Sequence, residues 1–304
     1  MKVAALDLGT NSFLCLIVEG GKPGIKKVLS DQVKVVRLGQ GVGKTGAFHP
    51  DALARAKACL TEFKKEIDRH NVDRILAMAT SAARDASNGP ELFKIGEDLG
   101  IPIEIIPGAD EARITFAGAT EGTLHGNENC IVVDVGGGST EFIVGNSNQL
   151  HFSKSLNIGC VRMTEKYITA QPLSQTERII VEEAIDSQLR TIMPEIQKHP
   201  AQDVLAVAGT PSAIAVAELG GKFDRAQVHG FVLDQAKLKK WCDLLANTTV
   251  QEKIDKYKIE AGRADVLFVG ASILYQFLLQ LKKPSMKVSI KGVRYGVALE
   301  ALRR

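Results

Sequence analysis

Apolar and polar residues follow two alternating periods along the first half of the chain. Runs with a period of two and many β-branched residues predict strands at 3–18, 33–38, 74–78 and 103–106. Between them, apolar residues recur at helical spacing in 50–69, 91–99 and 110–119. Regular alternation of strands and helices predicts an α/β fold.

The second half restarts with strands and then alternates again. We expect strands at 130–144, 149–155 and 204–208, and helices at 176–193, 212–219 and 233–245, the first of these ended by Pro194. The apolar stretch 266–281 contains Gly270, Ser272 and Gln276. Because it falls short of a membrane span, we interpret it as a buried helix.

One short pattern occurs twice, once in each half. Asp7-Leu-Gly9-Thr-Asn-Ser12 and Asp134-Val-Gly136-Gly-Gly-Ser139 both read Asp, x, Gly, x, x, Ser between apolar runs. In both cases the residues after the turn are again β-prone, so each pattern predicts a β-hairpin and not the strand-to-helix turn of a dinucleotide fold. An internal repeat of this kind indicates two related domains.

The two predicted turns have the composition of phosphate-binding turns. Small and hydroxyl residues offer backbone N–H groups and hydroxyls to a phosphate without a bulky side chain in the way. For either turn alone, an ordinary hairpin turn is an equal alternative, but their recurrence around a shared aspartate favours phosphate binding. The candidate phosphate-binding residues are Gly9, Thr10, Asn11 and Ser12 in the first turn and Gly136, Gly137, Gly138, Ser139 and Thr140 in the second.

Carboxylates lead into both turns, and a bound phosphate would repel them unless a cation intervened. Mg²⁺ is the natural choice, because it binds through one or two carboxylates together with phosphate oxygens and waters. The candidate metal ligands are Asp7, Asp134 and Glu141. The alternative is that each aspartate accepts hydrogen bonds from turn N–H groups.

Three further segments contain candidate functional residues, and each of them also has a purely structural interpretation. Gly209 and Thr210 precede a predicted helix whose free N–H groups could bind an anion, although a plain packing turn is the favoured interpretation. Asp110 and Glu111 open another helix, where acids usually cap or complement the helix dipole but could also activate water. Arg84 could clamp phosphate oxygens or pair with a neighbouring acid.

Two apparent motifs fail on spacing. Residues 41–45 resemble the end of a Walker loop, but the required first glycine would fall on Leu38 and the helix begins too late. Ser139 is not within a GxSxG pattern, and the histidines show no HxH or HExxH spacing. Serine-hydrolase and zinc-enzyme interpretations therefore have no support.

Length, charge and cysteine content narrow the class of protein further. A chain of 304 residues is expected to form two domains. A net charge of +3 with interleaved signs indicates neither a nucleic-acid groove nor a membrane-binding patch. The five cysteines form no CxxC pair and lie in apolar runs, so we expect buried reduced thiols and a cytoplasmic protein.

The ordered set of motifs resembles the exopolyphosphatase and guanosine pentaphosphate phosphohydrolase (Ppx/GppA) family in its short two-domain form. Each motif alone is weak, but their order along nearly the whole chain is specific. The matching segments are LDLGTNSF at 6–13, ATSAARDASN at 79–88, DEAR at 110–113, VVDVGGGSTEF at 132–142, AGT at 208–210, GRADV at 262–266 and GVRYGVALE at 292–300.

The resemblance implies two ribonuclease-H-like domains of the actin, sugar-kinase and heat-shock ATPase superfold, closing over a cleft. We expect residues 1–120, with the helix 291–304 returning to them, to form one domain and 121–290 the other. It also implies a homodimer. The sequence departs from the family at Leu14 and Cys15, at Pro211, and at Lys291, where the family often has an acidic or small residue.

For the site, the resemblance implies that Glu111 activates the attacking water and that Arg84 contacts phosphate. It assigns metal and phosphate handling to Asp134, Gly136 and Glu141, and makes Arg263 a further phosphate-binding candidate.

The resemblance therefore predicts a hydrolase that releases the terminal phosphate of polyphosphate, of guanosine pentaphosphate, or of both. The second of these would connect the protein to the stringent response. A kinase or ATPase of the same superfold, and a sensor of alarmone or polyphosphate without catalysis, are the alternatives.

Overall fold

The computed structural model describes residues 1–22, 24–124 and 126–304 of the chain, which form two compact units. Unit 1 comprises Met1–Glu121 and Lys291–Arg304, and unit 2 comprises Gly122–Ile290. Each unit contains one mixed β-sheet with helices packed on it. The predicted α/β class, with one mixed sheet in each of two units, is confirmed.

Unit 1 contains a five-stranded sheet in the order β3-β2-β1-β4-β5. The first three strands form an antiparallel meander, and β4 and β5 run parallel to β1. The strands are β1 (Lys2–Leu8), β2 (Ser12–Gly21), β3 (Gly24–Val35), β4 (Arg74–Ala79) and β5 (Ile103–Ile105). The helices are α1 (Val42–Thr45), α2 (Pro50–His70), α3 (Ser81–Asp85), α4 (Gly89–Asp98), α5 (Gly108–Ala119) and α14 (Val293–Arg303).

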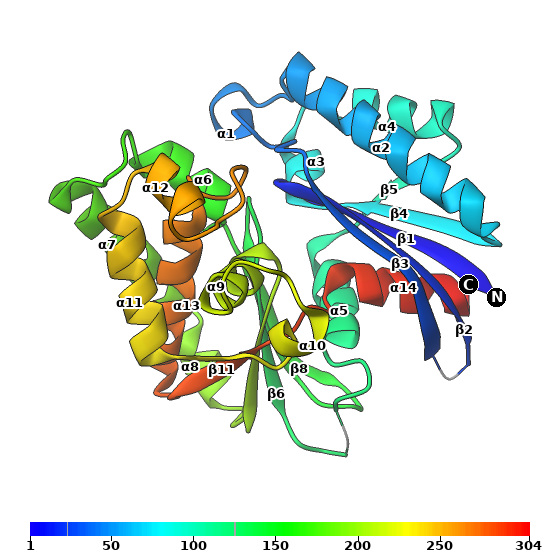
Figure 1. Ribbon diagram of the computed structural model, residues 1–304. Coiled ribbons are helices and arrows are strands. Elements are labelled where there is room, and N and C mark those ends of the chain that lie inside the picture. The colour runs from blue at the N-terminus through cyan, green and yellow to red at the C-terminus, as the bar shows by residue number, and fades with distance from the viewer. Residues whose placement is uncertain (23, 125) are drawn as a thin grey trace. The chain divides into compact units, whose positions relative to one another are not determined.

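The two faces of this sheet are covered by different helices, as Figure 1 shows. Ala4, Leu6 and Leu8 belong to the core formed with α2. Val3 and Ala5 instead belong to the core formed with α5 and α14. Because side chains alternate along a strand, Asp7 lies on the same face as Val3 and Ala5, the face that α5 covers.

Glycines allow α5 and α14 to pack closely. A Cβ atom on Gly118 would lie 2.1 Å from the carbonyl oxygen of Gly292, and one on Gly296 would lie 1.9 Å from the carbonyl oxygen of Ile114. Both obstacles are backbone atoms, which cannot rotate away as a side chain can. The spacing of the two helices therefore depends on hydrogen at these positions.

We expect Gly118→Ala to destabilise the protein by about 1–3 kcal/mol, because overpacking at a backbone contact forces the helices apart. Thermal and urea unfolding measure the effect. Gly108→Ala is the matched control in the same helix, since a Cβ atom there meets nothing within 4 Å. Equal stability of the two variants would contradict the close packing of α5 on α14.

Unit 2 contains a six-stranded sheet in the order β10-β11-β9-β6-β7-β8. Its strands are β6 (Cys130–Val135), β7 (Thr140–Gly145), β8 (Leu150–Leu156), β9 (Asp203–Val207), β10 (Val232–Asp234) and β11 (Ser285–Val288). Its helices are α6 (Cys160–Tyr167), α7 (Gln175–Arg190), α8 (Met193–Gln197), α9 (Gly209–Glu218), α10 (Arg225–Val228), α11 (Gln235–Ala246), α12 (Val250–Asp255) and α13 (Leu267–Leu281).

The two sheets repeat the same topology. In unit 2 the meander β6-β7-β8 is followed by β9 and β11 parallel to β6, in the same spatial order as the five strands of unit 1. The additional strand β10 pairs antiparallel with β11 at the sheet edge. The sequence repeat therefore corresponds to a repeat of the fold.

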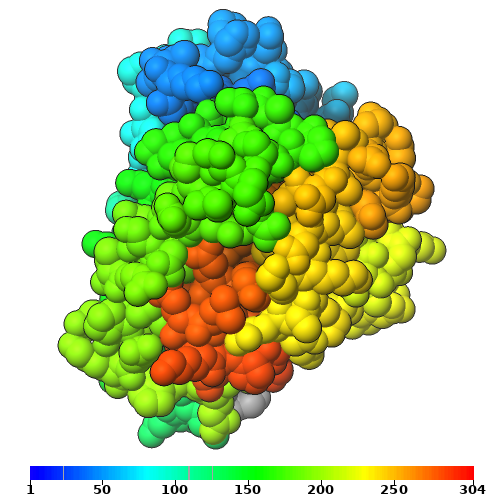
Figure 2. All heavy atoms as spheres, turned by 90° about the vertical axis from the view of Figure 1, so that its left-hand side faces the viewer, coloured from blue at the N-terminus to red at the C-terminus, as the bar shows by residue number. Residues whose placement is uncertain are grey.

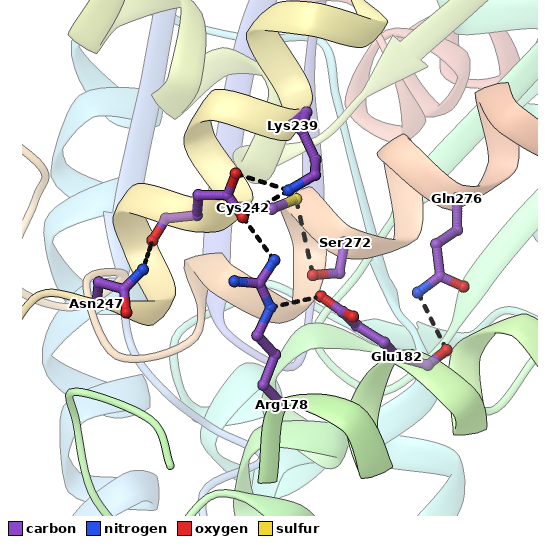
Figure 3. Close-up of polar contacts among 8 residues, drawn as sticks. Arg178, Glu182, Lys239, Cys242, Asn247, Ser272 and Gln276 are labelled. Carbon is purple, nitrogen blue, oxygen red and sulfur yellow. Dashed lines mark hydrogen bonds and ion pairs between the residues drawn. The ribbon is translucent and has the colours of Figure 1, made fainter. Parts of the chain in front are cut away.

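Helix α13 packs against α7 and α11 in unit 2, and all three reach the face shown in Figure 2. Figure 3 shows the polar contacts that join them. Arg178 of α7 donates to Glu182 in its own helix at 2.8 Å and to Asp243 of α11 at 2.6 Å. Burial alone would raise the pKa of Asp243, but hydrogen bonds from Lys239 and Arg178 lower it, so the carboxylate stays charged.

Several predicted boundaries are wrong, and three of them have a clear physical cause. Strand β3 spans Gly24–Val35 instead of 33–38, because its full length pairs with the long strand β2. The helix predicted at 233–245 begins at Gln235, since β10 occupies the preceding residues and Asp234 caps the helix by accepting from the Lys237 N–H. Helix α7 ends at Arg190, and Pro194 lies in the first turn of α8.

The cysteines and the apolar helix behave as expected. All five cysteines are buried, and none forms a disulfide. Burial raises the pKa of the Cys15 thiol to about 12, with smaller contributions from nearby groups. Throughout the described ranges, no helix has the length and hydropathy needed to span a membrane.

Candidate functional site

The first repeated turn joins β1 to β2, and the segment 36–39 forms hydrogen bonds with its carbonyl groups on one side. The N–H of Gly9 donates to the Ser12 carbonyl at 3.0 Å, which closes the turn. The Thr10 carbonyl accepts from the N–H of Gly39, and the Asn11 carbonyl accepts from the N–H groups of Val36 and Arg37. In a planar trans peptide the next N–H points opposite to the carbonyl, so the N–H groups of Asn11 and Ser12 point away from that segment.

The second turn joins β6 to β7 and repeats this arrangement. The N–H of Gly136 donates to the Ser139 carbonyl, again at 3.0 Å. The carbonyls of Gly136, Gly137 and Gly138 accept from backbone N–H groups of residues 159–162 at the start of α6. Three successive N–H groups, those of Gly137, Gly138 and Ser139, therefore point away from α6. Such a row of N–H groups is a concavity suited to an anion.

Parallel strands bring further candidates to the edge of the unit 1 sheet where the first turn lies. Strands β1, β4 and β5 all end there, because Leu8 pairs with Ala79 and Ala79 with Ile105. Helix α3, with Arg84, follows β4, and α5, with Glu111, follows β5. The first turn, Arg84 and Glu111 thus lie at one edge, and we call them the unit 1 cluster.

Within the unit 1 cluster, Arg84 and Glu111 form an ion pair. Nη1 of Arg84 lies 2.6 Å from Oε2 of Glu111 and also donates to the Ile106 carbonyl at 2.8 Å. Arg84 therefore pairs with an acid in this structure. The contact fixes the Glu111 carboxylate in a defined orientation.

Burial dominates the chemistry of Glu111, which is 5% exposed. Loss of hydration raises the pKa of its carboxyl above the usual 4.5, and the charge and hydrogen bond of Arg84 oppose that rise. A carboxylate with a raised pKa is a stronger base than an exposed one. Asp110, its neighbour in the same turn, has a side chain that is 56% exposed.

In unit 2, two acidic side chains lie opposite each other on adjacent strands. Asp134 of β6 pairs in register with Glu141 of β7, so both project from the same face of the sheet. Oε1 of Glu141 accepts from the hydroxyls of Ser139 and Ser155, each at 2.7 Å. Like charges directly opposite each other destabilise a sheet, which makes this pair suited to share a cation.

Two carboxylates, those of Asp134 and Glu141, are enough for Mg²⁺, which takes its other ligands from water and substrate. They are too few for a metal ion whose ligands all come from the protein. Across the described residues, no group of three or more His, Cys, Asp or Glu side chains is arranged to hold a metal ion. Mg²⁺ usually takes one or two carboxylates and completes its octahedron with waters and substrate phosphates. The donors present fit that pattern.

The third candidate segment lies at the same edge of the unit 2 sheet as the second turn. Asp134 pairs with Val207, so the end of β6 and the end of β9 are adjacent. A Cβ atom on Gly209 would lie 1.8 Å from Nη1 of Arg263, which shows that this guanidinium rests on the first residue of α9. The second turn, Asp134, Glu141, Gly209 and Arg263 form what we call the unit 2 cluster.

Two predicted phosphate-binding residues of unit 2 have hydroxyls that are directed into the protein. The Thr140 hydroxyl donates to the Ile158 carbonyl at 3.1 Å, and Thr140 has no exposed surface. Thr210 is 4% exposed and packs against Gly270 of α13. These contacts leave the backbone N–H groups, and not the hydroxyls, as the groups that could meet a phosphate.

Backbone strain marks the junction between β9 and α9. Ala208 has φ 74° and ψ −161°, a region that glycine alone populates readily. We expect Ala208→Gly to stabilise the protein by about 1 kcal/mol, because relief of strain of about 1–3 kcal/mol exceeds the entropic cost of glycine. Ala208→Val should lower the melting temperature. A lower melting temperature for the glycine variant would contradict strain at this position.

Sequence reasoning missed the segment that supports the second turn. Gly159 approaches the turn so closely that a Cβ atom would lie 2.3 Å from the Gly137 carbonyl oxygen. Arg162 adds a side-chain hydrogen bond from Nε to the Gly138 carbonyl at 2.7 Å. A glycine between a strand and an amphipathic helix was the available signal, but such junctions are common.

The comparisons with known proteins agree with this geometry. The model of the Ppx/GppA phosphatase family matches residues 16–304. Exopolyphosphatase 2 of Mycobacterium tuberculosis (strain H37Rv) is 34% identical, over 98% of this chain and 98% of that protein.

Solved structures also resemble the chain over its whole length. The crystal structure of an exopolyphosphatase from Cytophaga hutchinsonii has a TM-score of 0.91 at 25% identity, covering 100% of this chain and 98% of that one. A Ppx/GppA family member from Aquifex aeolicus has a TM-score of 0.81 at 29% identity, covering 99% and 97%.

Proposed function

Because the chain belongs to the Ppx/GppA phosphatase family, we propose that it releases the terminal phosphate from a phosphate chain by attack of water. The observation that carries the proposal is the repeated turn, in which backbone N–H groups are directed away from the supporting segment in both units. We propose inorganic polyphosphate, guanosine pentaphosphate or both as the substrates. The names of the similar exopolyphosphatases support the first of these.

In this proposal Glu111 acts as the general base. A phosphoryl group transferred to water needs positioning and charge stabilisation more than covalent chemistry, so one oriented carboxylate is sufficient. The Arg84 contact at 2.6 Å orients Glu111, and burial raises the pKa of its carboxyl, which makes it a stronger base. Arg84 is also close enough to this carboxylate to place a positive charge beside the reacting phosphate.

We propose Mg²⁺ as the cofactor, with Asp134, Glu141 and Asp7 as the candidate ligands. When bound, the ion would neutralise phosphate charge that these carboxylates otherwise repel. The turn N–H groups, Gly209 and Arg263 bind phosphate oxygens in the same proposal.

Release of phosphate from three substrates tests the proposal. Short polyphosphate, long polyphosphate and guanosine pentaphosphate are compared with and without Mg²⁺ and without an added acceptor. We expect Mg²⁺-dependent release of inorganic phosphate from at least one of them. Transfer of phosphate to an added acceptor without release of inorganic phosphate would identify a kinase, and binding without release would identify a sensor.

A further inference from the structure

Lys253 of α12 is a buried charge that the proposed chemistry does not use. The residue has no exposed surface, which is rare for a lysine unless its ammonium group is paired. Burial lowers the pKa of the ammonium group to about 8, and the nearby charge of Asp265 opposes that effect. A buried lysine of this kind costs folding free energy, so its surroundings indicate what it does.

The contacts of Lys253 lead to one loop. Its Nζ donates to Oε1 of Gln171, and Nε2 of Gln171 donates to the backbone carbonyl of Asp265 at 2.6 Å. The Lys253 carbonyl in turn accepts from the N–H of Ile259 at 3.1 Å. Both ends of the loop 259–265 are therefore tied to Lys253, one directly and one through Gln171.

This loop carries Arg263 of the unit 2 cluster. Nε of Arg263 donates to Glu260 at 2.9 Å, and the Arg263 backbone N–H donates to the Glu260 carbonyl at 2.9 Å. The Arg263 side chain is 15% exposed and rests on Gly209. The position of Arg263 over the start of α9 thus depends on the conformation of the loop 259–265, which is held by hydrogen bonds at both ends.

We propose that Lys253, through Gln171, positions Arg263 over the first residue of α9 and so sets the affinity of unit 2 for a phosphate chain. Lys253 is a positioning residue in this scheme, because it touches neither substrate nor metal. The choice of ligand rests on the proposed function, whereas the effect of Lys253 on Arg263 does not.

A double-mutant cycle tests the proposal. Lys253→Met, Arg263→Met and the double variant are compared with the wild-type chain for calorimetric binding of inorganic tripolyphosphate and for the KM and kcat of phosphate release. We expect Lys253→Met to raise Kd and KM about tenfold with kcat nearly unchanged, and to have no further effect once Arg263 is replaced. Additive effects of the two substitutions would overturn the proposal.

Two controls separate positioning from general loss of structure. Lys256→Met removes an exposed lysine just beyond the same helix and should leave affinity unchanged. If Lys253→Met does not fold, Gln171→Met removes the same hydrogen bonds between Lys253 and the Asp265 carbonyl. Its effect should likewise disappear once Arg263 is replaced by Met.

A crystal structure of Lys253→Met, or of Gln171→Met in its place, tests the inference apart from the function. We expect Arg263 to have left Gly209. An unmoved Arg263 would overturn the inference even if the chain is a phosphohydrolase. Failure of the wild-type protein to bind tripolyphosphate or release phosphate, with Arg263 displaced in the variant, would overturn the proposed function instead.

Discussion

Glu111→Gln is expected to lower kcat for phosphate release by about 10²–10⁴-fold, the range for loss of a general base. Glutamine keeps the shape of the side chain and a hydrogen-bond acceptor for Arg84 but cannot take a proton from water. Because Glu111 is 5% exposed and burial raises the pKa of its carboxyl, its carboxylate is a stronger base than an exposed one. KM should change little, since the substitution removes an interaction made in the transition state.

The pH profile provides a second readout of the same substitution. The base is active when deprotonated, so kcat/KM should rise with pH through the pKa of Glu111, above 4.5, and then level off. The glutamine variant should lose this rise. Asp110→Asn is the matched control, because it removes an exposed acid from the same turn. Full activity in Glu111→Gln would reject Glu111 as the base.

Asp134→Asn is expected to abolish Mg²⁺-dependent activity. The substitution removes one of two carboxylates that face each other across β6 and β7. In the absence of metal the same change should raise the melting temperature, because it relieves repulsion between like charges on opposed strand positions. If Asp134→Asn loses activity but is more stable than the wild-type protein without metal, Asp134 acts as a metal ligand and is not needed for folding.

The control for this prediction lies at the other end of the sheet. Asp203→Asn removes an exposed acid at the start of β9, which pairs with Lys287, and should change neither the metal response nor the activity. An Asp134→Asn variant with an unchanged dependence of rate on Mg²⁺ concentration would contradict the proposed metal site.

The hairpin repeat could be predicted from the sequence because its signals are local. Apolar alternation on both sides of Asp7 and Asp134, with glycine two residues later, determines strand, turn and strand within about a dozen residues. The extent of β3 could not be predicted, since it depends on pairing with β2 and not on its own composition. The short strands β10 and β11 pair with each other without a local turn signal, since Val232 and its partner Lys287 are 55 residues apart in the chain.

The site was predictable as a set of residues but not as a set of contacts. Arg84 and Glu111 are 27 positions apart, and only the parallel order of β4 and β5 places them at 2.6 Å. Lys253 has the sequence surroundings of any surface lysine on an amphipathic helix, so its complete burial followed from tertiary packing alone. The metal assignment began from the carboxylates that lead into both turns, and the substrate assignment from the family resemblance.

Hydrolysis of polyphosphate or guanosine pentaphosphate in ¹⁸O-labelled water tests the central claim most directly. The account predicts that each inorganic phosphate released carries one ¹⁸O atom from solvent, with Mg²⁺ present and no other acceptor added. Release of phosphate without solvent ¹⁸O, or no release from either substrate, would contradict the attack of water on a terminal phosphate.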